Sequence, residues 1–250
     1  MIALILAGGL GTRLKPLTNT LPKPMINIGD MPLLEHHINS LKYHHINDIW
    51  ITINYLPHII TEYFQHGSMF DVNIKYSYEL TPLGTAGALR NPNSTIEKEL
   101  KKKPFLITYG DNFTNFDYSK IIKFHKEKHA FMTIGLFKSP EPWTAGVVEI
   151  DKNKRIIKMI EKPPREECKT DLVNAGIYVC EPGIFDYIPK GVSDFGFDII
   201  PNILLDKKPI YGFTGNYFVQ DIGTPERLKK AQKLFENQFK KLKYSNSTLS

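Results

Sequence analysis

Short apolar runs alternate with segments of helical periodicity through the first half of the chain. The first run, Ile2 to Ala7, contains no polar residue, as in a strand buried on both faces of a parallel sheet. Apolar residues then recur at helical spacing from Leu33 to His45. We expect further strands at 49–53, 74–79, 104–109 and 131–137, and further helices at 57–65, 82–88 and 118–128, the last capped by Asp117. This alternation predicts βαβ units and a mainly parallel sheet.

The pattern changes after residue 146. Alternating runs at 147–151 and 155–160 predict an antiparallel hairpin with its turn at 151–154. We expect a strand at 172–180, a helix at 195–205, strands at 210–215 and 217–220, and a last helix with Thr224 as its N-cap and Pro225 as its first residue. The chain is therefore predicted to form one domain over residues 1–235, with two halves, followed by a lysine-rich tail at 236–250 that frays.

Composition narrows the class of protein. The 250 residues carry a net charge of +6, and many lysines lie in runs such as 101–103, which indicates a solvated basic surface. No basic helix carries base-reading residues, so a nucleic-acid partner is not expected. Two cysteines, Cys168 and Cys180, are too few for a disulfide framework. No stretch reaches membrane-spanning length and no leader pattern is found, so we expect a cytoplasmic protein without a membrane partner.

The first candidate for chemistry is the glycine-rich loop that follows the first strand. Gly8, Gly9 and Gly11 allow a tight turn that brings backbone N–H groups close to a polyphosphate. Arg13 and Lys23 add fixed positive charge beside the loop. The spacing fits neither the dinucleotide fingerprint G-x-G-x-x-G nor the Gly-Lys-Ser/Thr phosphate loop. The loop therefore predicts a site for a nucleoside triphosphate.

The longer string from Leu6 to Leu14, LAGGLGTRL, followed by Pro22-Lys23-Pro24, resembles the signature of the sugar-1-phosphate nucleotidyltransferases. The resemblance extends to about residue 235 and implies a Rossmann-like, three-layer α/β fold with a mixed, mainly parallel central sheet. It implies an enzyme that transfers a nucleotidyl group from a nucleoside triphosphate to a sugar-1-phosphate, releasing pyrophosphate. The nucleotide site that it implies comprises Leu6, Ala7, Gly8, Gly9, Gly11, Thr12, Arg13, Lys23, Glu79, Gly84 and Thr85.

Two aspartates are candidates for a metal site. Asp111 follows a predicted central strand and Asp221 follows another strand-like run, at the edge where open α/β sheets bind ligands. Carboxylates on two strand ends can hold Mg²⁺ and leave positions for water and phosphate. Gly110-Asp111 and the segment 221–225, DIGTP, resemble the two metal-binding motifs of the family. The resemblance implies that both aspartates share the metal, with Arg13, Lys23 and Asp111 as the catalytic residues.

The resemblance also implies a sugar-phosphate site in the second half of the chain. Lys162 of Glu161-Lys162-Pro163 is implied to bind the sugar phosphate and Glu161 a sugar hydroxyl. Asn174 can offer both a donor and an acceptor to hydroxyls. Gly146, at a strand start, is expected to present a backbone N–H to the sugar.

The sequence motifs identify the type of reaction better than they identify the base and the sugar of the substrates. Glu79 only accepts hydrogen bonds, which suits the adjacent N–H donors of guanine and favours GTP; it also suits uracil. The family branch most resembled comprises the mannose-1-phosphate and heptose-1-phosphate guanylyltransferases, whose products feed polysaccharide or glycan synthesis. Tyr109-Gly110-Asp111 instead resembles cytidylyltransferases, and uridylyl or thymidylyl transfer stays open. A catalytically silent regulatory subunit is the alternative of another class, and a homo-oligomer is compatible with the sequence.

Overall fold

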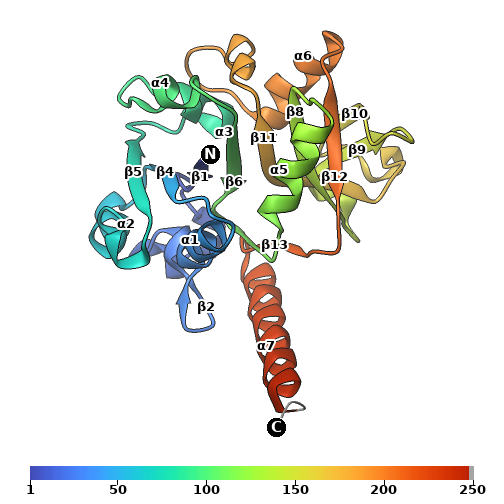
Figure 1. Cartoon of the computed structure of the whole chain (residues 1–250). Helices are drawn as coiled ribbons and strands as arrows, with labels where there is room; N and C mark the ends of the chain where they lie inside the picture. The colour runs from blue at the N-terminus through green and yellow to red at the C-terminus, as the bar shows by residue number, and fades with distance from the viewer. Residues whose placement is uncertain (248–250) are drawn as a thin grey trace.

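The computed structural model describes residues 1–247, with side chains described through residue 237. A nine-stranded sheet crosses its centre in the order β10-β9-β11-β6-β1-β4-β5, with β8 beside β11 and β12 beside β8 (Figure 1). These strands are β1 (Ile2–Leu6), β4 (Asp48–Ile53), β5 (Asn73–Tyr78), β6 (Phe105–Tyr109), β8 (Met132–Lys138), β9 (Gly146–Ile150), β10 (Ile156–Glu161), β11 (Leu172–Cys180) and β12 (Ile210–Thr214). Strands β6, β1, β4 and β5 are parallel, whereas β11 runs antiparallel to β6. The predicted mixed, mainly parallel α/β sheet is confirmed.

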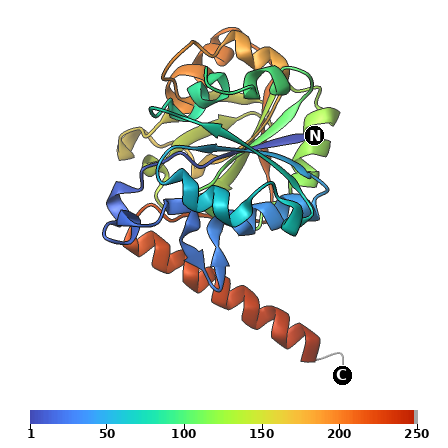
Figure 2. The same ribbon diagram turned by 90° about the vertical axis from the view of Figure 1, so that its left-hand side faces the viewer.

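Helices cover both faces of this sheet, as Figure 2 shows. They are α1 (Leu33–Tyr43), α2 (Pro57–Phe64), α3 (Gly84–Gly87), α4 (Ile96–Leu100), α5 (Tyr118–Glu127), α6 (Ile200–Leu205) and α7 (Pro225–Ser247). Alternate residues of β1 point to opposite layers: Leu4 belongs to the core that includes Leu100 and Ile203, and Ile5 to the core that includes Ile38. A strand without polar positions therefore contributes side chains to the cores on both faces of the sheet.

The last helix lies apart from the other helices. In both views α7 extends away from the body of the molecule (Figures 1 and 2). Its first turns pack Ala231 into a third core with Ile28 and Phe113, and Gln232 donates to the carbonyl of Asn27 at 2.7 Å. This junction also contains two small sheets, formed by β2 (Asn27–Ile28) with β3 (Met31–Pro32) and by β7 (Asn112–Thr114) with β13 (Val219–Asp221).

The structure differs from the sequence prediction mainly near the C-terminus. The strand predicted at 217–220 is β13, which begins only at Val219, because the Tyr217 hydroxyl turns inward and donates to the carbonyl of Phe213 at 2.9 Å. Helix 195–205 begins as a π-helical turn, Phe195–Ile199, before α6. Helix α7 continues to Ser247, so residue 235, the predicted boundary between domain and tail, lies inside a helix. The fraying expected for the tail stays a prediction, and residues 248–250 lie outside the described residues.

The predicted caps are confirmed. Asp117 accepts a hydrogen bond from the Lys120 N–H at 3.0 Å at the start of α5, and Thr224 accepts one from the Arg227 N–H at 3.3 Å at the start of α7.

Among the described residues, no helix is both long and apolar enough to cross a membrane.

Candidate active site

Three parallel strands end side by side where the candidate site forms. Leu6 of β1 is paired with Thr52 of β4 on one side and with Tyr109 of β6 on the other. The next N–H along β1, that of Ala7, donates to the Thr52 hydroxyl at 3.1 Å. Because the carboxyl ends of parallel strands share one edge, the loops that follow these strands meet at one place.

The glycine-rich loop leaves its backbone open at this edge. A Cβ placed on Gly9 would have no atom within 4 Å, so this glycine borders free space. Gly11 has a φ of +62°, which L side chains rarely adopt, and its carbonyl accepts a hydrogen bond from the Thr18 hydroxyl at 2.9 Å. The loop therefore turns tightly and brings the backbone of its glycines to the wall of the cavity beside it.

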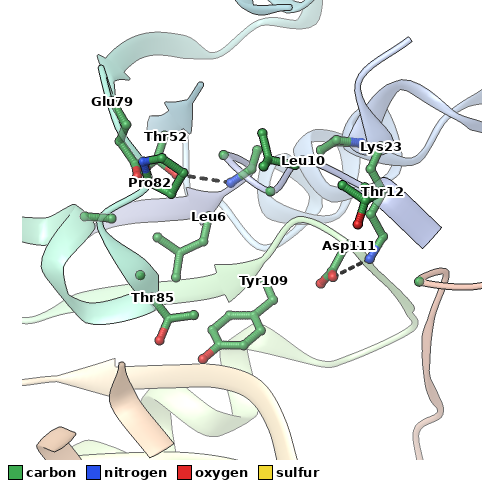
Figure 3. Close-up of a pocket in the computed structure, with 18 of the residues that line it drawn as sticks. Leu6, Leu10, Thr12, Lys23, Thr52, Glu79, Pro82, Thr85, Tyr109 and Asp111 are labelled. Atoms are coloured by element: carbon green, nitrogen blue, oxygen red, sulfur yellow. Dashed lines mark hydrogen bonds and ion pairs between the residues drawn. The ribbon is translucent and has the colours of Figure 1, made fainter. Parts of the chain in front are cut away.

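This cavity has a volume of about 440 Å³. All eleven residues expected to bind the nucleotide lie on its wall: Leu6, Ala7, Gly8, Gly9, Gly11, Thr12, Arg13, Lys23, Glu79, Gly84 and Thr85. Figure 3 shows Glu79 and Pro82 at one end of the cavity and Lys23 with Asp111 at the other. At the first end of the cavity Glu79 is the main charged group, whereas several charged side chains lie at the other end. This division is compatible with the base and the phosphates of a nucleoside triphosphate.

Glu79 is buried at the first end of the cavity. Its Oε2 accepts a hydrogen bond from the Leu83 N–H at 3.0 Å, and its Oε1 lies 3.0 Å from where a Cβ on Gly8 would be. Burial raises the pKa of Glu79, and hydrogen bonds from the Leu83 N–H and the Thr52 side chain act in the opposite direction. Part of its acceptor capacity is therefore used inside the protein, and the rest is left for a ligand in the cavity that Glu79 lines.

Charged atoms converge at the other end around Gly223. The Lys23 Nζ lies 2.6 Å from the Asp111 Oδ2. A Cβ placed on Gly223 would lie 2.8 Å from the Asp221 Oδ1, 3.2 Å from the Arg13 Nη2 and 3.4 Å from the Lys23 Nζ. Any side chain at position 223 would therefore crowd these charges, so the glycine keeps the space between them free.

The donor set at this point is compatible with a magnesium ion. Asp111 and Asp221 supply carboxylate oxygens from two strand ends, and Ile222 ties them together by donating its N–H to the Asp111 carbonyl at 3.0 Å. Among the described residues, no group of three or more histidine, cysteine or acidic side chains is arranged so that it could hold a metal ion by itself. Two carboxylates with substrate phosphates and water suit Mg²⁺, which keeps several waters and seldom needs a full protein cage.

A second cavity, of about 740 Å³, adjoins the first. Both cavities share part of their walls, formed by Arg13, Thr85, Tyr109, Asp111 and Asp194. The residues expected to bind the sugar phosphate, Gly146, Glu161, Lys162 and Asn174, line the second cavity together with Asp221. The fold therefore brings both predicted sets together, across a boundary at which Asp111 lies.

Glu161 fits closely between two glycines. A Cβ on Gly146 would lie 2.6 Å from the Glu161 Oε2, and one on Gly196 would lie 2.4 Å from the same atom. Burial raises the pKa of Glu161, Lys162 opposes this rise, and the charge of Asp194 adds to it. The two glycines thus make room for a carboxylate that is partly removed from water.

Lys162 follows directly in a left-handed backbone conformation, with a φ of +47°. Its N–H donates to the Ala145 carbonyl at 3.1 Å, which ties the end of β10 to the loop before β9. A non-glycine residue at positive φ persists only where its surroundings hold it. This backbone turn directs the lysine to the wall of the second cavity.

Asn174 uses part of its amide inside the protein. Its Oδ1 accepts from the Gly176 N–H at 2.9 Å and its Nδ2 donates to the Tyr178 hydroxyl at 2.6 Å. One N–H and one lone pair remain, which are the donor and the acceptor that Asn174 is expected to offer to a ligand.

Sequence reasoning missed several residues of these walls. Asp194, in the turn before the π-helical segment, borders both cavities, and Arg227 and Lys230 of α7 border the second. Arg227 Nη1 lies 2.8 Å from the Asp221 Oδ2. No strand end or motif marks Asp194 in the sequence. Arg227 sits six residues after a predicted metal ligand at the start of a helix, and this spacing could have indicated it.

Comparisons with known proteins agree with this geometry. A family model described as "Nucleotidyl transferase" matches residues 2–238. A UTP–glucose-1-phosphate uridylyltransferase from Synechocystis sp. is 33% identical over 235 residues, which cover 89% of this chain and 60% of that protein. A mannose-1-phosphate guanyltransferase from Saccharomyces cerevisiae is 33% identical over 244 residues, which cover 96% of this chain and 66% of that protein. The chain thus spans less than two thirds of the length of these relatives.

Two solved structures share the fold. A putative glucose-1-phosphate thymidylyltransferase from Bacillus anthracis has a TM-score of 0.84 at 26% identity, covering 94% of this chain and 95% of that chain. HddC from Yersinia pseudotuberculosis, complexed with GMP-PN, has a TM-score of 0.77 at 26% identity, covering 94% of this chain and 99% of that chain.

Proposed function

This chain belongs to the nucleotidyl transferase family, and we propose that it transfers a nucleotidyl group from a nucleoside triphosphate to a sugar-1-phosphate. The observation that carries the proposal is the pair of adjoining cavities. One contains the glycine-rich loop, the other contains Glu161 and Lys162, and Asp111 borders both. Two phosphorylated substrates bound in these cavities would meet at that aspartate.

The reaction is a substitution at phosphorus. An oxygen of the sugar-1-phosphate forms a bond to the α-phosphorus, and the bond from that phosphorus to the oxygen bridging to the β-phosphorus breaks. Pyrophosphate leaves with the electron pair. The attacking oxygen is already anionic, so no general base is needed. The protein has to align two anions and to stabilise the charge that develops on the leaving group.

The charged residues divide this work by position. Arg13 borders both cavities and Lys23 the first, so both are placed beside the triphosphate, where the leaving group gains charge. Lys162 borders only the second cavity, where it would bind the phosphate of the sugar. Arg binds phosphate as a planar fork and Lys as a point charge, which suits these two tasks.

Asp111 and Asp221 would hold a Mg²⁺ ion. When bound, the ion would supply positive charge to the phosphate oxygens at the reacting phosphorus. The protein's own part is to keep the two carboxylates in place: the Lys23 ammonium holds Asp111 and the Arg227 guanidinium holds Asp221.

For the base we propose guanine, and for the sugar a mannose- or heptose-type 1-phosphate. Support comes from the buried acceptor Glu79, from the guanyltransferase relative and from the structural neighbour that was complexed with GMP-PN. Uridylyl transfer is the second candidate, because a uridylyltransferase is equally similar in sequence and the same carboxylate can accept from uracil N3–H. Cytidylyl and thymidylyl transfer are further outcomes of the same test.

The test combines each of five nucleoside triphosphates with a panel of sugar-1-phosphates in the presence of Mg²⁺. Pyrophosphate release measures turnover, and we expect the greatest kcat/KM with GTP. Greater turnover with UTP would replace the guanylyl proposal by the second candidate. If no combination of triphosphate and sugar-1-phosphate releases pyrophosphate, the alternative of a catalytically silent regulatory subunit would be favoured. We also propose that the protein works in the cytoplasm, where such substrates are made, with no nucleic-acid partner; a homo-oligomer stays a prediction.

A further inference from the structure

The two cavities are connected through the protein by a chain of side-chain hydrogen bonds. It runs from the second cavity to the first through Asn174, Tyr178, Tyr109, Thr85 and Asp194. The Tyr178 hydroxyl lies 3.1 Å from that of Tyr109, and the Thr85 hydroxyl lies 2.9 Å from the Asp194 Oδ1. Tyr109 also forms a side-chain hydrogen bond with Thr85. Of the five side chains, only that of Tyr178 lines neither cavity.

Backbone N–H groups fix the direction of the chain at the second cavity. The Gly176 N–H can only donate, so the amide oxygen of Asn174 faces it and the amide nitrogen faces Tyr178. The Tyr178 hydroxyl therefore accepts from Asn174 and donates its proton to Tyr109.

The other end is fixed in the same way. The Phe195 N–H donates to the Thr85 hydroxyl at 3.0 Å, so the proton of that hydroxyl points to Asp194. The Asp194 Oδ1 also accepts from the Thr85 N–H at 3.0 Å. The side-chain hydrogen bond between Tyr109 and Thr85 joins the two halves of the chain. Burial raises the pKa of both tyrosines, so their hydroxyls keep their protons at neutral pH.

We propose that Tyr178 is a positioning residue that acts on both substrate sites through this chain, although it touches neither substrate. The proposal rests on the proposed function, because it assigns the two cavities to a nucleotide and a sugar phosphate. Tyr178 holds Asn174 on one side and Tyr109 on the other. Since Tyr109 belongs to the wall of both cavities, a change at Tyr178 reaches the nucleotide site from the sugar side.

Contiguity alone does not establish energetic coupling, so the test has to measure it. Tyr178→Phe removes one oxygen and preserves the ring. Tyr118→Phe is the matched control: Tyr118 is also fully buried, its hydroxyl lies 3.4 Å from the Thr108 hydroxyl, and it borders neither cavity. Dissociation constants are measured by calorimetry, separately for the best-bound nucleoside triphosphate with Mg²⁺ and for the best-bound sugar-1-phosphate.

We expect Tyr178→Phe to weaken both ligands by about 5- to 10-fold, the loss typical of one buried hydrogen bond, and Tyr118→Phe to change neither by more than about 2-fold. In a double-mutant cycle with Thr85→Val, the double variant should bind the nucleotide no more weakly than Thr85→Val alone, because both changes break one chain. Thr85→Ser, which keeps the hydroxyl, should restore nucleotide binding.

Three outcomes overturn the inference while leaving the proposed function intact. They are equal effects of Tyr178→Phe and Tyr118→Phe, an effect of Tyr178→Phe on the sugar phosphate alone, and additive losses in the cycle. Wild-type protein that binds no triphosphate and no sugar phosphate would instead overturn the proposed function. If Tyr178→Phe does not fold, Tyr109→Phe breaks the same link and takes its place in the cycle.

Discussion

Lys23 and Asp111, 88 residues apart in the sequence, form an ion pair of 2.6 Å at the wall of the nucleotide cavity. The side chain of Lys23 is 9% exposed and that of Asp111 is 40% exposed. A nearly buried ammonium needs a partner of opposite charge, and Asp111 provides one from the side open to the cavity. The pair therefore places a positive and a negative group together at the point where the phosphates would bind.

Asp111→Asn removes the negative charge that we assign to metal binding while preserving the shape of the side chain. We expect kcat to fall by about 10²–10³-fold, the loss typical of one electrostatic element of an active site. Asp171→Asn is the control, since Asp171 pairs with Lys138 at 3.4 Å outside both cavities. Pyrophosphate release with Mg²⁺ measures the effect, and near-wild-type turnover of Asp111→Asn would rule out the metal assignment.

Lys162→Ala and Arg13→Ala should differ in kinetic pattern. We assign Lys162 to the sugar phosphate in both ground and transition states, so its loss should raise KM for that substrate by about 10-fold. We assign Arg13 to the position where charge develops on pyrophosphate, so its loss should lower kcat by about 10²-fold. Lys158→Ala, an exposed lysine of β10, is the control. If Lys162→Ala and Arg13→Ala change kcat and KM in the same way, the proposed division of roles between the two residues is wrong.

Glu79→Gln tests the choice of base. The change exchanges one acceptor oxygen for a donor and removes the charge, which mismatches the two adjacent donors of guanine. We expect kcat/KM for GTP to fall about 10-fold further than that for UTP or dTTP. Glu62→Gln, exposed on α2, is the control. An unchanged ranking of triphosphates would leave Glu79 with only its structural bonds to Leu83 and Thr52.

Glu161→Gln should stabilise the protein in a pH-dependent way. Burial raises the pKa of Glu161 in the folded state above the ordinary value of 4.5. Below that value both folded and unfolded chains are protonated. As pH rises from there through the raised pKa, the unfolded chain ionises first and stability is lost.

Glutamine does not ionise, so the stability of the variant does not fall with rising pH for this reason. We expect the Tm difference between the variant and the wild type to grow as pH rises above 4.5 and then to level off. Thermal unfolding from pH 4 to 8 measures it, with Glu149→Gln on the neighbouring strand β9 as the control. A difference that shrinks with rising pH would contradict the burial of this carboxylate. The same variant should bind the sugar-1-phosphate more weakly, because we assign the Glu161 carboxylate to a sugar hydroxyl.

The strands and most helices could be read from the sequence because their signals are local. The run from Ile2 to Ala7 has apolar residues on both faces, and Asp117 has the side chain that a helix N-terminus needs. Where a tertiary contact competes, local reasoning fails: Tyr217 has high strand propensity, yet its hydroxyl is drawn inward to the carbonyl of Phe213.

The sequence by itself determined the α/β class, the family resemblance and the candidate residues that lie in contiguous motifs, but not Asp194, Arg227 or Lys230 of the cavity walls. Only the tertiary structure decided which of them meet. The pairing of Lys23 with Asp111, the two glycines around Glu161, and the bonds from Tyr178 to Tyr109 and from Thr85 to Asp194 join residues far apart in the sequence. Their distances depend on how the strands are ordered in the sheet and how the crossing segments pack, and no local pattern carries that information.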